Sequence, residues 1–284
     1  MAEPVVTVCG LWVRHRGAPD DAVAGVDFEV RRGEVFGLLG PNGAGKSTTQ
    51  QVLTGQLRRF TGRVRVLGRA VADWGPALYQ RIGVGFELPA YFPRLTAREN
   101  LAAFAALYRG PVEPPERALA AVGLAEAADR RVSGFSKGMK MRLNLARALM
   151  HHPELLFLDE PTSGLDPAQA GDVRAVIRAQ ADAGHTVLLT THDMPTVEEV
   201  CDRVAFLDRG RIIATDSPRN LRIAHGRPAV AVEYGSGGGI ARAEFPAPDD
   251  PGLLALLATG RVQTVHTRES SLAEVFVALT GAPR

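Results

Sequence analysis

The chain has 284 residues, of which 45% are hydrophobic and 23% charged. These values predict a globular protein with one large domain, or one domain with a small appendage, and exclude collagen-like, disulfide-scaffold and largely disordered chains. The 33 basic and 31 acidic residues are interleaved and give a net charge of +2. Because nucleic-acid binding usually depends on a clustered basic field, we expect no nucleic-acid partner.

The cysteines and the N-terminal residues indicate the cellular compartment of the protein. Cys9 and Cys201 form no disulfide framework, which suits a reducing environment. The N-terminal residues lack the pattern of a signal peptide, and the apolar runs are far shorter than the twenty or so residues of a membrane-spanning helix. The sequence therefore predicts a cytoplasmic protein, unless a partner holds it at a membrane.

Short apolar runs alternate with longer periodic segments, which predicts an α/β fold. We expect buried strands at residues 5–9, 35–39, 82–86, 155–158, 186–190 and 203–207, and antiparallel strands at 24–30 and 63–67. We expect helices at residues 46–54, 97–108, 138–150, 168–183 and 195–200. The helical character of residues from about 88 to 150 indicates a small subdomain inserted in the sheet.

The C-terminal part has a different pattern. A break is expected after Ile213, a flexible stretch at residues 234–239 and a turn at 246–251. Strands at 229–233 and 262–266 and a helix at 272–279 indicate a small α/β element. The predicted organisation is a main domain over residues 1–220 and a small extension over 221–284.

A glycine-rich segment follows the strand at 35–39 and leads into a helix. It reads GPNGAGKS and fits the phosphate-binding pattern GxxxxGK[ST]. Glycines allow backbone N–H groups to approach phosphates, and the helix N-terminus adds its dipole. We expect Lys46 to neutralise the β- and γ-phosphates and Ser47 to bind Mg²⁺. The predicted nucleotide contacts are Gly40, Pro41, Asn42, Gly43, Ala44, Gly45, Lys46, Ser47 and Thr48.

Two acids end the apolar strand near residue 158. Asp159 is suited to holding Mg²⁺, and Glu160 would then lie beside the γ-phosphate as a general base for an attacking water. Acids also end strands for purely structural reasons, so this pair is a weak signal by itself.

Three further segments accompany the loop and the acids. They are FSKGM at residues 135–139, SGLD at 163–166 and TTHD at 190–193. In this order and spacing, residues 5–220 resemble the nucleotide-binding subunit of ABC transporters. The resemblance implies a P-loop NTPase of the α/β class with a mixed sheet, and an ATPase that uses ATP and Mg²⁺.

The resemblance also implies a head-to-tail dimer, which we expect to be a homodimer. Each ATP would lie between the phosphate loop of one protomer and the segment Ser136, Lys137 and Gly138 of the other. Asp166 would join these contacts, and His192 would contact the γ-phosphate and help to hold the attacking water.

Three positions depart from the family pattern or match it loosely. Glu87 occupies a position where the family usually has Gln, which reaches Mg²⁺ and senses the membrane partner; a carboxylate can also bind Mg²⁺. Lys137 replaces the usual Gly of its segment. His15 is the better-spaced candidate to stack on adenine, with Trp12 as the other, although a histidine at the pocket rim would look the same.

The tail at residues 270–281 resembles exporter ATPases of the drug- and antibiotic-resistance type, which pair with a separate transmembrane permease. Residues 88–101 suit a groove for a short helix of that permease, or simply lead into a helix capped by Thr96 and Glu99. We therefore expect an ATP-hydrolysing subunit held at the cytoplasmic face of the membrane by a permease that exports a drug, antibiotic or other small hydrophobic compound.

Two alternatives remain at this point. A soluble ABC ATPase acting on ribosomes or DNA usually carries two cassettes or a long coiled coil, and neither is visible here. An ATP-gated regulator without useful hydrolysis would be consistent with Glu87, whereas intact Glu160 and His192 argue against it.

Overall fold

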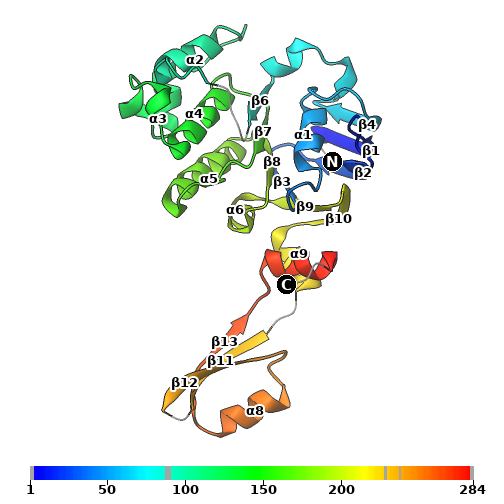
Figure 1. Ribbon diagram of the computed structural model, residues 1–284, viewed down its shortest axis with the longest axis vertical. Helices are drawn as coiled ribbons and strands as arrows, with labels where there is room; N and C mark the ends of the chain where they lie inside the picture. The colour runs from blue at the N-terminus through cyan, green and yellow to red at the C-terminus, as the bar shows by residue number, and fades with distance from the viewer. Residues whose placement is uncertain (1–2, 87–90, 227–228, 237, 282–284) are drawn as a thin grey trace. The chain divides into compact units, whose positions relative to one another are not determined.

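The computed structural model describes residues 3–86, 91–226, 229–236 and 238–281. By its internal contacts the chain divides into two compact units, Met1–Asp216 and Ser217–Arg284 (Figure 1). Every chemical motif identified above belongs to the larger unit.

Two sheets form the framework of the larger unit. The six-stranded sheet has the order β10-β9-β3-β8-β7-β6, with β10 antiparallel to β9 and the other pairs parallel. A four-stranded antiparallel sheet has the order β2-β1-β4-β5. The strands are β1 (Val6–Val13), β2 (Val23–Val30), β3 (Val35–Leu39), β4 (Thr61–Val66), β5 (Arg69–Ala70), β6 (Ile82–Gly85), β7 (Leu155–Asp159), β8 (Thr186–Thr191), β9 (Arg203–Asp208) and β10 (Arg211–Asp216).

The parallel strands are continuous apolar runs because both of their faces are covered. All residues of β3 and β8 are buried. A single hydrophobic cluster joins the two sheets, and in it the rings of Phe28 and Phe36 stack with centroids 5.5 Å apart. This shared core fixes the antiparallel sheet beside the strand that leads into the phosphate loop.

In the described residues of the larger unit, six α-helices lie around these sheets. Figure 1 shows α2, α3 and α4 grouped on the side away from β1, β2 and β4. They lie in the chain between β6 and β7, two strands that are neighbours in the sheet. The helices are α1 (Lys46–Leu53), α2 (Ala97–Ala105), α3 (Pro115–Ala121), α4 (Lys137–Leu149), α5 (Pro167–Asp182) and α6 (Met194–Val200).

Side-chain caps set where three of these helices begin. The predicted capping box of α2 is confirmed, because Thr96 and Glu99 bond to each other's backbone N–H. Ser136 accepts a hydrogen bond from Met139 N at the start of α4, and Asp166 accepts one from Gln169 N at the start of α5. The last two caps come from residues that the sequence also assigns to the nucleotide site.

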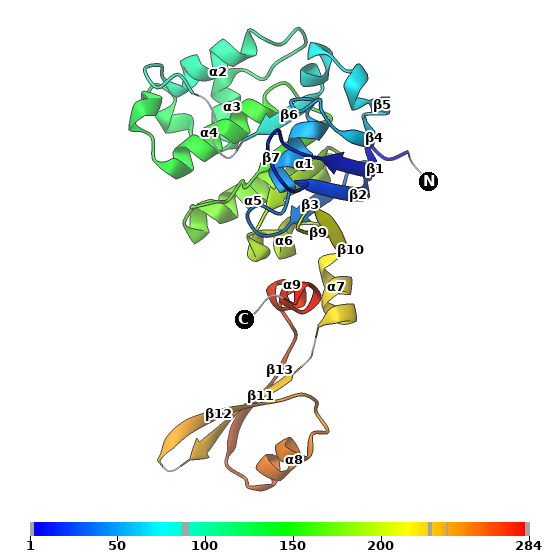
Figure 2. The same ribbon diagram turned by 45° about the vertical axis from the view of Figure 1, so that its right-hand side comes forward.

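The smaller unit is built around a three-stranded antiparallel sheet of order β12-β11-β13, shown with its helices in Figure 2. Val230, Val232 and Leu253 form its small core. Its elements are α7 (Pro218–His225), β11 (Ala229–Ser236), β12 (Gly239–Phe245), α8 (Pro251–Ala258), β13 (Val262–Arg268) and α9 (Leu272–Thr280).

The structure differs from the sequence prediction mainly near the C-terminus. The break after Ile213 is wrong, since β10 continues to Asp216 by pairing with β9. The flexible stretch at 234–239 is also wrong for its described residues, because Tyr234, Gly235 and Ser236 pair with the start of β12 in a hairpin. The turn expected at 246–251 is confirmed at residues 246–249, where Asp250 N donates to Ala247 O at 3.2 Å, and α8 then begins with Asp250 as the cap and Pro251 in the first helical position.

Close packing of β6 against α4 generates a stability prediction. A Cβ added at Gly83 would lie 2.1 Å from Ala148 O, a backbone atom that cannot move independently. Gly83→Ala should lower the free energy of unfolding by about 1–3 kcal/mol. Urea denaturation followed by tryptophan fluorescence measures this, because Trp12 and Trp74 both lie in the larger unit.

Gly75→Ala is the matched control, because a Cβ there meets no atom within 4 Å. Its effect should stay within about 0.5 kcal/mol. Equal denaturation midpoints for the two variants would contradict the proposed contact.

Candidate functional site

The phosphate loop joins β3 to α1 and depends on glycine at two positions. A Cβ at Gly40 would lie 2.1 Å from Leu207 O, and a Cβ at Gly45 would lie 2.4 Å from Ala22 O. Gly45 also has a φ of +105°, which disfavours any side chain. The loop can therefore pack between β9 and the segment before β2 only with glycine at these two positions.

Lys46 points back into this loop. Its ammonium donates hydrogen bonds to Gly40 O at 2.7 Å and to Pro41 O at 3.3 Å, and only 6% of the residue is exposed. The nearest acid is Glu160, whose Oε1 lies 3.6 Å from Lys46 Nζ. A buried cation is thus held where the loop would enclose a phosphate.

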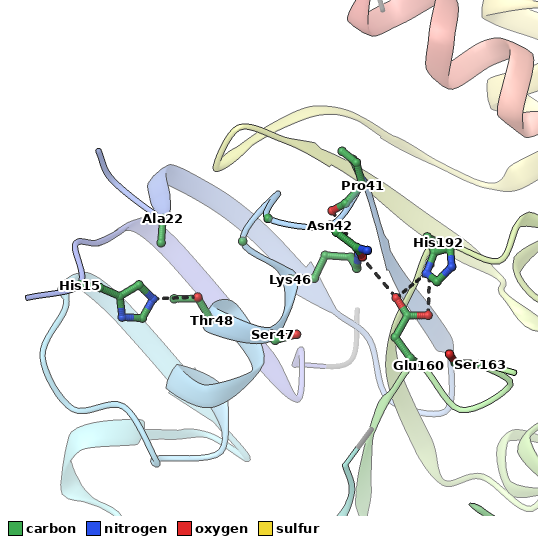
Figure 3. A pocket seen from close by; sticks show the side chains of 12 residues that line it. His15, Ala22, Pro41, Asn42, Lys46, Ser47, Thr48, Glu160, Ser163 and His192 are labelled. Carbon is green, nitrogen blue, oxygen red and sulfur yellow. Dashed lines mark hydrogen bonds and ion pairs between the residues drawn. The ribbon is translucent and has the colours of Figure 1, made fainter. Parts of the chain in front are cut away.

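Glu160 faces the ammonium group of Lys46 (Figure 3). Its carboxylate accepts a hydrogen bond from Thr191 Oγ1 at 3.0 Å and lies 2.9 Å from His192 Nδ1. The residue is 6% exposed, whereas the His192 side chain is 57% exposed. Glu160 also has a φ of +48°, an uncommon conformation for a residue with a side chain, and such strain is concentrated at functional sites.

Asp159 and Ser47 provide oxygen atoms beside the same loop. Ser47 Oγ lies 3.4 Å from Asp159 Oδ1, and Thr190 donates a hydrogen bond to that oxygen. Among the described residues, no group of three or more His, Cys, Asp or Glu side chains could form a metal site alone. Mg²⁺ prefers a few protein oxygens together with waters and substrate phosphates, so a hydroxyl and one carboxylate fit that ion. Glu87, the third predicted ligand, lies outside the described residues.

One hydrogen bond holds His15 beside the loop, and a second contact closes the hairpin that carries it. Its Nε2 lies 3.1 Å from Thr48 Oγ1, and the hairpin that carries it is closed by hydrogen bonds from Arg14 to Asp21 at 2.8 and 3.0 Å. The hydrogen bond from Arg14 lowers the pKa of the Asp21 carboxyl. Arg14 is exposed and Asp21 is half-buried, so this pair orients the hairpin more than it stabilises the fold.

These groups line one cavity of about 490 Å³. Of the predicted site residues it brings together His15, Pro41, Asn42, Gly43, Gly45, Lys46, Ser47, Thr48, Glu160 and His192. Ala22 and Ser163 also line it and were not predicted. Ser163 is the first residue of the SGLD segment and could have been suspected, whereas Ala22 is placed only by its backbone contact with the loop.

Gly40, Ala44 and Asp159 are not among the lining residues, although they belong to the same loop and strand end. Four other predicted residues gather elsewhere in the larger unit. Ser136, Lys137 and Gly138 begin α4, and Asp166 caps α5. The two helix starts touch, because a Cβ at Gly138 would overlap Gln169 Oε1 and one at Gly164 would lie 2.3 Å from the Lys137 ammonium. The structure therefore brings the predicted residues together in two groups on one protomer.

Comparison with known proteins identifies the family that has this arrangement of residues. A family profile described as ABC transporter matches residues 23–163. A protein of Mycobacterium tuberculosis named fluoroquinolones export ATP-binding protein is 53% identical over 281 residues, which are 98% of this chain and 93% of the relative.

The chain belongs to the ABC transporter family.

Another relative, the daunorubicin/doxorubicin resistance ATP-binding protein of Streptomyces peucetius, is 36% identical to this ABC subunit over 92% of the chain and 88% of the relative. A solved structure titled as an ATP binding subunit of an ABC transporter is 26% identical and superposes with a TM-score of 0.73, covering 97% of this chain and 99% of that one.

The fold class and the resemblance predicted from the sequence are therefore confirmed: this is an ATP-binding subunit and an ATPase of the α/β P-loop type. No helix of the described residues is long and apolar enough to cross a bilayer. A solved structure titled as the dimeric, post-hydrolysis state of an ATP-binding cassette bound to ADP and Pi has the same fold, with a TM-score of 0.67 at 24% identity over 75% of this chain and 98% of that one.

The position of Lys46 generates a binding prediction. Lys46→Ala removes the buried cation of the loop, so ATP affinity should fall about a hundredfold. Isothermal titration calorimetry with ATP measures the change. Lys140→Ala is the control, because it removes a lysine of α4 that does not line the cavity. Unchanged ATP affinity in Lys46→Ala would refute the assignment of the loop.

Proposed function

We propose that this ABC ATPase powers a separate membrane permease that exports a drug, an antibiotic or another small hydrophobic compound. For the chemistry, the supporting observation is the buried carboxylate of Glu160 in contact with both Lys46 and His192 on the cavity wall. For the cargo class, support comes from the 53% identical relative that is named for fluoroquinolone export.

The roles of the cavity residues follow from their chemistry. Lys46 and the backbone N–H groups of residues 42–48 bind the β- and γ-phosphates, and Ser47 and Asp159 hold Mg²⁺, with Glu87 as a further ligand. The metal, when bound, neutralises charge on the phosphates. His15 stacks on adenine, and its bond to Thr48 fixes the orientation of the ring.

Glu160 is the general base. It accepts a proton from a water whose oxygen forms a bond to the γ-phosphorus, while the bond from that phosphorus to the oxygen of ADP breaks. His192 stays near the γ-phosphate and orients the water. Lys46 Nζ lies 3.6 Å from Glu160 Oε1, so a γ-phosphate bound at Lys46 would compete with this carboxylate for the lysine. ATP binding thereby frees the base that acts on it.

The second group of residues serves a partner protomer. Ser136, Lys137, Gly138 and Asp166 lie at two helix starts that line no part of the cavity of their own chain. Helix N-termini favour anions, and Lys137 adds a positive charge. We assign these residues to the outer face of an ATP held by a second copy of the chain in a head-to-tail homodimer.

The proposed permease determines the cellular location of the ATPase, and the two compact units of the chain determine its domain organisation. The ATPase lies at the cytoplasmic face of the membrane, bound through the permease. Residues 1–216 are the ATPase domain, in which residues 88–150 contain the helical subdomain, and residues 217–284 are a small C-terminal extension, because a boundary at residue 220 would divide α7.

The role of Glu160 gives a prediction that separates binding from hydrolysis. Glu160→Gln keeps the shape of the side chain but cannot accept the proton, so turnover should fall at least about a hundredfold while ATP-dependent dimerisation persists. Steady-state phosphate release and light scattering with MgATP measure the two properties. Wild-type hydrolysis in this variant would disprove the general-base role, and a dimer independent of ATP would disprove the head-to-tail arrangement.

The proposed partner is tested with the same variant. Tagged Glu160→Gln protein, which should stay in the ATP-bound dimer, is purified from detergent-solubilised native membranes with MgATP, and bound proteins are identified by mass spectrometry. We expect one multi-spanning permease, and Lys46→Ala should recover much less of any partner that prefers the ATP-bound form. Recovery of ribosomal or DNA-bound proteins without a membrane protein would assign the ATPase to another process.

A further inference from the structure

Two consecutive threonines end β8 beside Asp159, the last residue of β7, and Glu160, which follows that strand. The strands pair in parallel, and Asp159 lies opposite Thr190. Successive side chains of a strand point to opposite faces, so Thr190 and Thr191 cannot serve the same carboxylate. Each of them instead bonds to a different acid, Thr190 to Asp159 and Thr191 to Glu160.

Thr191 connects Glu160 to the loop that carries His192. Its buried hydroxyl donates to Glu160 Oε2 at 3.0 Å and accepts from Asp193 N at 2.9 Å. One hydroxyl therefore holds the carboxylate and the backbone next to His192 at once. With Oε2 held in this way, Oε1 is the oxygen that faces His192 and Lys46.

The loop is also fixed from its other side. Thr162 Oγ1 donates to Asp193 Oδ2 at 3.0 Å, and Thr196 Oγ1 donates to the same oxygen at 2.5 Å. Thr162 and Thr196 are buried, with 5% and 0% of their surface exposed. Hydrogen bonds therefore hold both the side chain and the backbone N–H of Asp193. Because Asp193 is held in place, its N–H fixes the position of the Thr191 hydroxyl that contacts Glu160.

Thr190 holds Asp159 in the way that Thr191 holds Glu160. It is fully buried, and its hydroxyl donates to Asp159 Oδ1, the oxygen that lies 3.4 Å from Ser47 Oγ. A donor on that oxygen limits how the carboxylate can rotate. Asp159 is thereby directed toward the point where a metal would meet Ser47.

We propose that Thr191 is a positioning residue for Glu160 and that Thr190 is a positioning residue for Asp159, an inference that rests on the proposed roles of these two acids. Hydrogen bonds to ionised acceptors are about twice as strong as neutral ones, and catalytic groups need their geometry held to within about 0.5 Å. The strained backbone of Glu160 makes such a restraint more necessary, because the strand alone does not fix its side chain.

The test for Thr191 compares Thr191→Val with Thr191→Ser in steady-state MgATP hydrolysis by the full chain. Valine keeps the volume and removes the hydroxyl, so kcat should fall about tenfold while the Kd for ATP stays within about twofold. Serine keeps the hydroxyl and should restore kcat to within about twofold to threefold of wild type. Should the valine variant not fold, Thr191→Ala replaces it in the same comparison.

The test for Thr190 uses the metal as its readout. Thr190→Val should raise the Kd for Mg²⁺ in the presence of ATP about tenfold in isothermal titration calorimetry. The Mg²⁺ concentration for half-maximal hydrolysis should rise with it, and kcat at saturating Mg²⁺ should change much less. Thr190→Ser should return the Mg²⁺ dependence to that of the wild type. A Thr190→Val variant with wild-type Mg²⁺ dependence would overturn this half of the proposal.

Thr186→Val is the matched control for both tests. Thr186 begins the same strand, is fully buried and accepts a hydrogen bond from Gly33 N at 2.9 Å, at the end away from the carboxylates. It should lower the Tm as the other valine variants do but leave kcat and Mg²⁺ dependence unchanged. Equal kcat losses in Thr186→Val and Thr191→Val, or no rescue by serine, would overturn the positioning role of Thr191.

Glu160→Gln separates failure of this inference from failure of the proposed function. If Glu160→Gln is inactive and Thr191→Val has wild-type kcat, only the inference is wrong. If Glu160→Gln hydrolyses ATP normally, the assignment of Glu160 as general base is wrong, and the positioning role falls with it.

Discussion

The contact between Lys46 and Glu160 is the interaction on which the site depends. Both side chains are almost completely buried, and a buried charge is costly unless a partner compensates it. Lys46 comes from the loop after β3, whereas Glu160 follows β7, and β8 lies between these strands. The pair can therefore form only when the parallel strands are aligned so that their carboxyl ends reach one edge. Under the roles proposed for these residues, a bound triphosphate would offer the lysine a more highly charged anion and would release the carboxylate.

The sequence predicts the local parts of this site well. The eight adjacent residues GPNGAGKS include the glycines, the lysine and the hydroxyl of a phosphate-binding loop. The loop, Lys46 and Ser47 can therefore be identified without knowing the rest of the fold. Contacts across the sheet are different, because they depend on strand order and register. The bond between Thr191 and Glu160 joins residues 31 positions apart and exists only because β7 and β8 pair in parallel. Nothing in the two threonines themselves distinguishes them from other strand residues.

The errors near the C-terminus have a related cause. β10 reads as the end of a domain because it pairs only with β9 in the sheet and its side chains are mostly exposed, so it lacks the apolar run of a buried strand. The glycine-rich segment after Tyr234 reads as a linker, yet β-hairpins favour glycine near their turns. Composition describes how freely a segment can bend, whereas its partner strand determines whether it is ordered.

The insertion of α2, α3 and α4 between two neighbouring strands has a consequence for how the chain acquires its structure. Ile82 on β6 pairs with Leu155 on β7, so this edge of the sheet closes across more than seventy intervening residues. Closing so long a loop costs entropy, and contacts among the intervening helices reduce that cost because they shorten the effective loop. During synthesis from the N-terminus, the phosphate loop emerges long before β7 and β8. The early chain thus carries the cation of the site for over a hundred residues before its carboxylate partner is made.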